Sequence, residues 1–139
     1  MPKYTLYGDG IHDDYPAIQE MIDSGVCEVA LPAPKAFYLI SNTLVIPSNF
    51  KLKLPRFAEI RLADNANCLM LRSKTVIKPG KNLPQFFTER QKLSWYFVDL
   101  YSAAPEDACC NFEIEGGIWN LNNLKMKANP FQSGFGLPL

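Results

Sequence analysis

The residues best able to do chemistry lie near the start of the chain, where Asp9, His12, Asp13 and Asp14 fall within six positions. Carboxylates and an imidazole can bind a metal ion, or they can act as a general acid and base. A metal site needs several ligands that converge from different parts of the fold, and local spacing alone does not supply them. The acidic run is therefore either a chemical site or the start of a helix.

The residues that follow favour a helix. Asp13 or Asp14 is a suitable N-cap, because a carboxylate accepts hydrogen bonds from the free N–H groups of the first turn. Pro16 suits that turn, and Gly25 stands where a glycine often ends a helix. An apolar stripe with helical spacing lies between them, made of Tyr15, Ile18, Met21 and Ile22. This pattern predicts an amphipathic helix over residues 14–24.

With the helix in place, little of the acidic run is left for chemistry. We expect Asp9, Asp13 and Asp14 to form a structural cap and His12 to be a turn residue rather than a base. We expect no bound metal ion and no other cofactor.

Composition narrows the class of protein. A chain of 139 residues with 47% hydrophobic residues predicts a single domain with its own core. The formal net charge is zero and no apolar run reaches spanning length, so we expect neither nucleic acid nor a membrane as a partner. Four cysteines lack the spacing of a zinc site, and we interpret them all as buried thiols: Cys27, Cys68, Cys109 and Cys110.

After the helix, the chain is organised as short strands. Apolar residues alternate with other residues, and turn signals separate the runs. Six segments show this pattern: 27–32, 37–40, 43–47, 50–55, 59–63 and 67–72. Strands this short and this evenly spaced are typical of a sandwich, a barrel or a β-solenoid.

A weak internal repeat favours the solenoid. The segments 48–55 and 110–117 share Asn-Phe followed by alternating aliphatic residues, with Asn49 and Asn111 lying 62 positions apart. In a stacked array of about 20–30 residues per coil, this offset predicts two to three coils with an insertion in one of them. The open end of such a stack needs a cap, which the helix over 14–24 can supply.

These segments resemble the N-terminal opening of the pectate-lyase superfamily, whose members are right-handed parallel β-helices of the pectin-lyase-like type. The resemblance covers residues 5–72 and returns at 111–123, where it is closest to polygalacturonase-like glycoside hydrolases, with Asn120 in place of their usual Asp. The residues that carry it are Gly8, Asp9, Gly10, Asp13, Asp14, Ala17, Ile18, Gln19, Leu31, Pro32, Tyr38, Ile40, Leu44 and Ile46. It implies an all-β fold, a right-handed parallel β-helix with an N-terminal capping helix.

The resemblance also implies a division of the chain. Residues 1–25 would form the N-terminal turn and capping helix, and 26–72 the first coils of the solenoid. Residues 73–110 would be an insertion or irregular coil, and 111–139 a further coil. The catalytic carboxylates of the related hydrolases have no matching residues here. We therefore expect a truncated chain that lacks a catalytic set and is inactive alone.

Aromatic and cationic residues are the candidates for sugar contact. Flat rings pack on sugars, and cations pair with acidic sugars. The candidate substrate-binding residues are Arg90, Lys92, Trp95, Tyr96 and Trp119. The alternative is that residues 95–101 form a buried strand, that the lysines are solvated and that Trp119 is a core residue.

Three functions remain open at this point. The resemblance implies a glycoside hydrolase acting on a pectin-like polysaccharide, a non-catalytic polysaccharide-binding protein such as a phage tailspike or adhesin, or a polysaccharide lyase. The expected partner is a polysaccharide or oligosaccharide in each case. An exposed solenoid end would also allow self-association, as a trimer in the tailspike case. The family suggests an extracellular or periplasmic location.

Overall fold

The computed structural model describes residues 2–66, 68–74 and 109–126. One helix is followed by a series of short strands and a final 3-10 turn. The elements are α1 (Tyr15–Asp23), β1 (Glu28–Ala30), β2 (Tyr38–Ile40), β3 (Leu44–Ile46), β4 (Phe50–Lys53), β5 (Glu59–Leu62), β6 (Leu71–Ser73), β7 (Phe112–Glu115), β8 (Ile118–Asn120) and η2 (Asn123–Lys125).

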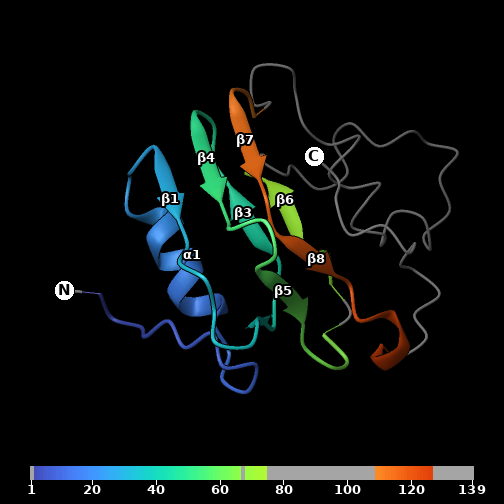
Figure 1. Ribbon diagram of the computed structural model, residues 1–139. Coiled ribbons are helices and arrows are strands. Elements are labelled where there is room, and N and C mark those ends of the chain that lie inside the picture. Colours follow the sequence, from blue (N-terminus) through green and yellow to red (C-terminus); the bar gives the residue numbers. More distant parts are fainter. Residues whose placement is uncertain (1, 67, 75–108, 127–139) are drawn as a thin grey trace, which may run out of the picture.

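The strands form three separate parallel sheets in which every third strand pairs. The orders are β1-β4-β7, β2-β5-β8 and β3-β6, so consecutive strands always belong to different sheets (Figure 1). We call β1–β3 the first round, β4–β6 the second and β7–β8 the third. The expected all-β fold with parallel strands and one helix is confirmed.

The first five predicted strand segments contain β1 to β5 and are confirmed, whereas the sixth, 67–72, overlaps only the start of β6 and does not alternate, because Leu69, Met70 and Leu71 are buried in succession. In each of β2 to β5, every second side chain is buried. Parallel pairing places like residues side by side, as in the ladders Val29–Leu52 and Phe50–Phe112. Because side chains alternate between the two faces of a strand, one face of each sheet joins a common core and the other points outward.

The prediction of two to three coils between Asn49 and Asn111 is wrong. Strand β4 pairs directly with β7, and Asn111 Nδ2 donates to Asn49 Oδ1 across 3.1 Å. The offset of 62 positions is therefore one step between neighbouring strands, lengthened by the segment after β6. Both asparagines have left-handed backbones, with φ of 57° and 54°, which asparagine tolerates better than most residues.

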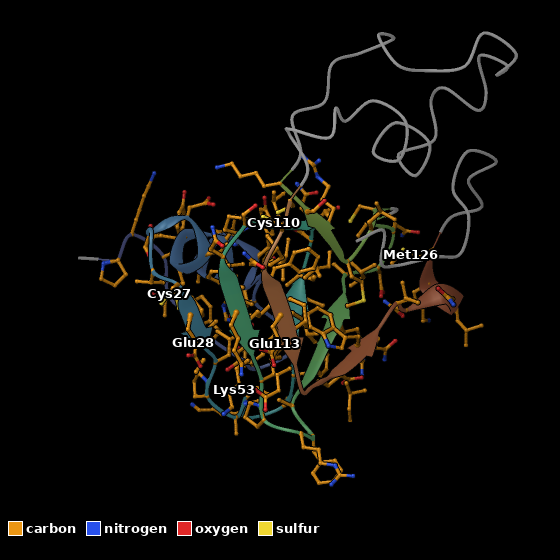
Figure 2. All side chains as sticks on the ribbon, turned by 90° about the horizontal axis from the view of Figure 1, so that it is seen from above. Cys27, Glu28, Lys53, Cys110, Glu113 and Met126 are labelled. Carbon is orange, nitrogen blue, oxygen red and sulfur yellow. The ribbon has the colours of Figure 1, made fainter. Side chains whose placement is uncertain are left out.

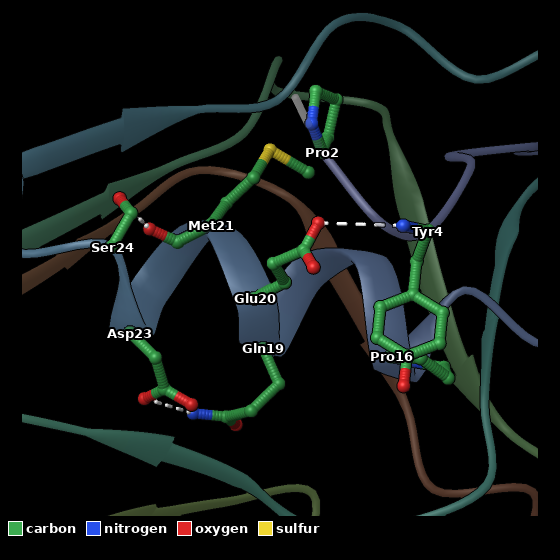
Figure 3. A pocket seen from close by; sticks show the side chains of 8 residues that line it. All are labelled: Pro2, Tyr4, Pro16, Gln19, Glu20, Met21, Asp23 and Ser24. Carbon is green, nitrogen blue, oxygen red and sulfur yellow. Dashed lines mark hydrogen bonds between the residues drawn. The ribbon is translucent and has the colours of Figure 1, made fainter.

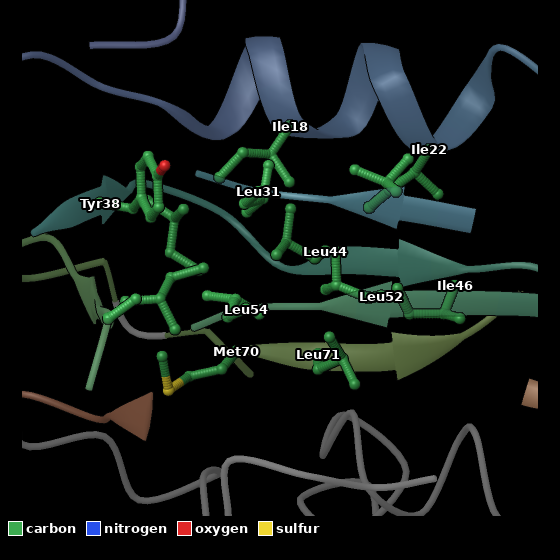
Figure 4. Packing of buried hydrophobic residues seen from close by; sticks show 14 of the residues in the cluster. Ile18, Ile22, Leu31, Tyr38, Leu44, Ile46, Leu52, Leu54, Met70 and Leu71 are labelled. Atoms are coloured by element: carbon green, nitrogen blue, oxygen red, sulfur yellow. The ribbon is translucent and has the colours of Figure 1, made fainter. Parts of the chain in front are cut away.

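The core lies between the three sheets and beneath α1. Figure 4 shows the helix residues Ile18 and Ile22 pointing toward side chains from the strands below. The strand residues include Leu44, Leu52 and Leu71, one from each of three strands, and all are fully buried. Burial of this kind is worth about 1.5–3 kcal/mol per large aliphatic side chain. The hydrophobic effect therefore holds the sheets together.

The N-terminal segment closes the edge of the first round. The Asp14 N–H donates to Leu39 O at 2.7 Å, next to a bridge between Asp13 and Leu39, so the chain here acts as an extra partner for β2. The Gln19 carboxamide does the same for β3, because it accepts from Val45 N–H at 2.9 Å and donates to Val45 O at 3.1 Å. These contacts satisfy strand edges that would otherwise be free to pair with another chain.

The helix itself matches the prediction closely. It begins one residue after Asp14 and ends before Ser24, and Gly25 follows in a left-handed conformation with φ of 87°. Ile18 and Ile22 are buried, while Tyr15 and Met21 are partly buried against the core. No helix in the described part of the chain is long and apolar enough to cross a membrane.

Gly116 allows two strands to turn closely past each other. It has a φ of 77°, and a Cβ at this position would collide with the backbone carbonyl oxygen of Leu54. Only glycine satisfies both conditions. The paired glycines of the sequence, Gly116 and Gly117, are thus a packing requirement between the second and third rounds.

The interpretation of all four cysteines as buried thiols is wrong, because two are exposed and two are only partly buried. Each is a free thiol, but Cys27 and Cys110 are exposed, while Cys68 and Cys109 are partly buried. Cys27 comes just before β1 and Cys110 just before β7, at the corner where each round enters its first sheet (Figure 2). Turn positions expose side chains that the strand pattern does not govern.

Candidate functional site

The acidic run at the front of the chain forms a turn stabilised by its own side chains. Asp9 Oδ1 accepts from the backbone N–H groups of Ile11 and His12, each at 2.9 Å, and Oδ2 lies 2.7 Å from His12 Nδ1. The His12 ring stacks on Tyr7 with 4.3 Å between ring centroids. Hydrogen bonds from the His12 backbone and ring hold the pKa of Asp9 well below its usual value. Asp9 thus stabilises a local turn.

Asp14 stands at the N-cap position, but its carboxylate does not cap the helix. It is fully buried and accepts from Tyr7 N–H at 2.6 Å and from Gly8 N–H at 3.1 Å. Burial raises the pKa of the Asp14 carboxyl, while the two backbone donors act in the opposite direction. The sequence-based expectation of a capping hydrogen bond from Asp14 is therefore wrong: Asp14 fixes the backbone of Tyr7 and Gly8 against the helix start.

The side-chain hydrogen bond at the helix start comes from Asp13 and not from Asp14. Asp13 Oδ1 accepts from Tyr15 N–H at 3.0 Å and from Ser41 N–H at 3.1 Å, and its Oδ2 accepts from Ser41 Oγ. It thereby joins the helix start to the turn after β2. Among the described residues, no group of three or more His, Cys, Asp or Glu side chains could hold a metal ion.

The predicted sugar-contact residues divide into two groups. Arg90, Lys92, Trp95 and Tyr96, and the alternative buried strand over 95–101, lie outside the described residues. Trp119 is described: it pairs with Ile60 in the ladder between β5 and β8, packs against the core, and donates from Nε1 to Gly116 O at 3.2 Å. This placement favours the packing interpretation of Trp119 over a sugar platform.

A polar cluster on the outward face of β2, β5 and β8 was not anticipated from the sequence. The Arg61 guanidinium lies over the Phe37 ring, 3.9 Å from its centroid. Its Nη2 donates to both oxygens of Glu59, at 2.9 and 3.1 Å, and Asn120 Nδ2 donates to Glu59 Oε1 at 2.8 Å. We call these four residues the Arg61 cluster. The only sequence signal for it was the alternation of Glu59 and Arg61 with buried residues.

The adjacent sheet carries a ladder of opposite charges. On the outward face of β1, β4 and β7, Glu28 pairs with Lys51, and Lys51 pairs with Glu113. The Lys51 ammonium lies 2.7 Å from Glu115 and 3.4 Å from Glu113, and these contacts raise the pKa of Lys51 and lower that of Glu115. Exposed pairs of this kind add little stability, but they disfavour misregistered strands.

Two hollows flank the helix. Figure 3 shows the first, about 770 Å³, between the outer side of α1 and the N-terminal segment, with Tyr4, Glu20 and Met21 in its lining. The second, about 680 Å³, lies between the end of α1 and the turn from β3 to β4, and includes Asp23, Cys27 and Lys74. Both are lined by separate polar groups rather than by a convergent catalytic set.

Comparison of the chain with known proteins finds no matching family model, no matching curated protein and no matching solved structure. The geometry therefore carries the functional argument. Asp13 and Asp14, which are adjacent in the sequence, accept backbone hydrogen bonds in the cap, and Glu113 and Glu115 share the Lys51 ammonium. Two arrangements of polar side chains face outward from the described sheets: the charge ladder around Lys51 and the Arg61 cluster, in which hydrogen bonds and a ring contact join side chains of different strands.

Proposed function

We propose that the chain forms the capped N-terminal part of a right-handed parallel β-helix. The observation that supports this most is the pairing of every third strand in parallel across three sheets, with a shared interior. A connection between parallel strands of one sheet is almost always right-handed, which supports a right-handed coil. The covering of β2 and β3 by the N-terminal segment agrees with a solenoid cap.

The residues that carry the resemblance to the pectate-lyase superfamily make contacts that support it. Gly8 lies against Pro34 and Tyr38, and the Tyr38 hydroxyl donates to Pro32 O. The Gln19 side chain accepts a hydrogen bond from the Val45 N–H in the first round. Gly8 and Tyr38, which are far apart in the matched pattern, thus meet at the cap, as the proposed fold requires.

From the fold and this resemblance, we infer a carbohydrate-active protein with a polysaccharide as its ligand. Fold alone does not define an activity, so the choice between binding and catalysis rests on the side chains. Hydrolysis of a glycosidic bond requires two carboxylates that face the scissile bond. The neighbouring carboxylates of the described residues are engaged in other contacts: Asp13 and Asp14 accept backbone hydrogen bonds, and Glu113 and Glu115 pair with Lys51. We therefore assign capping and binding, rather than catalysis, to this part of the protein.

The proposal is tested by measuring both binding and turnover on the same polysaccharides. The purified chain is incubated with a panel of neutral and acidic plant and microbial polysaccharides, and retention on the insoluble ones is measured. Release of reducing ends reports hydrolysis, and ultraviolet absorbance of unsaturated sugar ends reports lyase activity. We expect retention without release of either product. Failure to be retained by any polysaccharide would overturn the proposal.

Light scattering on the same sample separates the remaining alternatives. A monomer that is retained by a polysaccharide agrees with a scaffold or binding part of a hydrolase. A stable trimer with retention and no product would instead support the tailspike or adhesin alternative, because those proteins assemble through their β-helices.

A further inference from the structure

The outward face of β2, β5 and β8 carries polar side chains that hydrogen-bond to one another. Arg61 and Glu59 project from β5 and Asn120 from β8, and Phe37 comes just before β2, so the cluster joins two strands and the residue that leads into the third. The Arg61 and Glu59 side chains are 34% and 22% exposed, which leaves them reachable but not freely solvated. Partly exposed side chains that hydrogen-bond to one another are suited to bind a ligand.

The side chains of the Arg61 cluster are held in place before any ligand arrives. The Phe37 ring supports the guanidinium from one side, and Glu59 ties Arg61 and Asn120 to each other. Asn120 is fixed again by its Oδ1, which accepts from Asn122 N–H at 2.9 Å. Ordering flexible side chains is a main cost of binding, so a cluster that is already ordered gives up little free energy when a ligand docks.

The N-terminal turn forms a wall beside the cluster. Gly10 sits so close to Phe37 that a Cβ would lie 2.7 Å from the ring atom Cε1. The same turn is fixed by the hydrogen bonds from Ile11 and His12 to Asp9. Phe37 is therefore clamped between the turn and Arg61, and the cluster has a rigid border on the β2 side.

Hydrogen-bonding capacity remains on this face after the internal bonds are counted. The internal bonds to Glu59 use Nη2 of Arg61, which leaves the Nη1 donors, and a carboxylate has more lone pairs than the three contacts it accepts here. Arg61 Nε is buried and has no hydrogen-bond partner among the described residues, so it adds no donor that a ligand could reach. Ile118, which pairs with Glu59 across the ladder, leaves 48% of its surface exposed and adds an apolar contact.

We propose that this face binds a neutral carbohydrate, with Arg61 donating to and Glu59 accepting from sugar hydroxyls, and Ile118 packing against the C–H face of a sugar ring. The Arg61–Glu59 pair is balanced in charge, which suits a ligand with hydroxyl groups and no net charge. An acidic sugar would place its carboxylate beside that of Glu59. This inference rests on the proposed function and names the ligand class and the residues that contact it.

Nuclear magnetic resonance on the intact chain tests the site directly. The nitrogen-15-labelled protein is titrated with linear hexasaccharides of glucose, xylose and mannose, and with a hexamer of galacturonic acid. We expect a neutral hexasaccharide to shift the Arg61 Nε–H and Asn120 side-chain resonances, with the acidic hexamer causing smaller changes. Shifts confined to other parts of the molecule would overturn the inference, and so would a preference for the acidic hexamer.

Matched variants separate this inference from the proposed function. Glu59→Gln is compared by calorimetric titration with Glu113→Gln, which removes an outward carboxylate from the neighbouring sheet. We expect Glu59→Gln to weaken binding at least tenfold and Glu113→Gln to change it less than twofold. Ile118→Ala, at an exposed position, gives a second test if Glu59→Gln does not fold, and we expect it to weaken binding several-fold.

The outcomes distinguish a wrong binding site from a wrong function. If a neutral oligosaccharide binds and neither Glu59→Gln nor Ile118→Ala weakens it, the site lies elsewhere and only the inference falls. If no polysaccharide or oligosaccharide of either charge binds, the proposed function falls with it.

Discussion

Strands β4 and β7, which open the second and third rounds, follow the same alternating pattern, but they are buried to different depths. Leu52 in β4 is fully buried, whereas its ladder partner Ile114 in β7 is only partly buried. Strand β4 has a neighbour on each side, and among the described strands β7 has one. In a stack of strands, therefore, the depth of a core position depends on the neighbouring rounds and not on the residue itself.

The first round shows a second way to complete the stack. Its edge is closed not by another strand but by α1 and the segment before it, which supply Ile18 and Ile22 to the core and Gln19 to the backbone of β3. The cap thus provides both apolar cover and hydrogen bonds. If this comparison between the rounds is right, substitutions in the cap and the second round should cost more than their counterparts in the third.

The largest difference is expected between equivalent core positions of β4 and β7. Leu52→Ala should lower the free energy of unfolding by about 2–5 kcal/mol, because it leaves a cavity in the middle of the stack. Ile114→Ala should cost about half as much or less, because its surroundings can relax or be hydrated. Urea unfolding followed by circular dichroism measures both. Equal losses would show that the two rounds are equally well packed.

The buried tyrosine of the first round should make stability depend on alkaline pH. Burial, and then the charge of Asp14, raise the pKa of Tyr38 to about 12 from its usual value of about 10. A raised folded pKa means that stability is fully present below pH 10 and is lost as the pH rises to about 12. The shift corresponds to about 2–3 kcal/mol.

The comparison of the wild-type chain with Tyr38→Phe isolates this effect from the other ionising groups. The variant should lose about 1 kcal/mol at neutral pH with its hydrogen bond to Pro32 O, but its stability should fall less steeply between pH 10 and 12. Thermal unfolding across this range is the measurement. Parallel curves for the two proteins would contradict the burial of the Tyr38 hydroxyl.

A smaller effect is expected for the carboxylate of the cap. Asp14→Ala should cost about 2 kcal/mol, because the backbone N–H groups of Tyr7 and Gly8 lose a charged acceptor in a buried place. Asp64→Ala is the matched control. Asp64 accepts from Asn122 Nδ2 at 2.8 Å at an exposed turn of the later rounds, and its loss should cost less than about 1 kcal/mol. If the control costs more than Asp14→Ala, the cap is not the critical region.

The smallest effect concerns the strand edge that Gln19 satisfies. Gln19→Glu keeps an acceptor for Val45 N–H but removes the donor to Val45 O, and should cost about 1 kcal/mol. Hydrogen exchange of the Val45 amide reports this edge specifically, and we expect faster exchange in Gln19→Ala than in Gln19→Glu. Unchanged exchange in both variants would show that α1 does not protect β3.

Local structure was largely predictable because it depends on local rules. The helix over Tyr15–Asp23 and the strands β1 to β5 follow from periodicity, and the left-handed Gly25 follows from its position after the helix. The roles of Asp14 and Trp119 were harder to predict from the sequence. Asp14 turns away from its own helix because Tyr7 and Gly8 present N–H groups to it, and sequence spacing does not reveal that approach.

The sequence by itself determined which faces of the strands are apolar, where the helix begins and that the polar residues Glu59 and Arg61 lie on the same side of β5. Only the tertiary structure decided which strands are neighbours. It reduced the offset between Asn49 and Asn111 to one step and brought Phe37, Glu59, Arg61 and Asn120 into one cluster. The physical reason is that alternation fixes the direction of a side chain along its own strand, whereas contact between strands depends on the path of the chain between them.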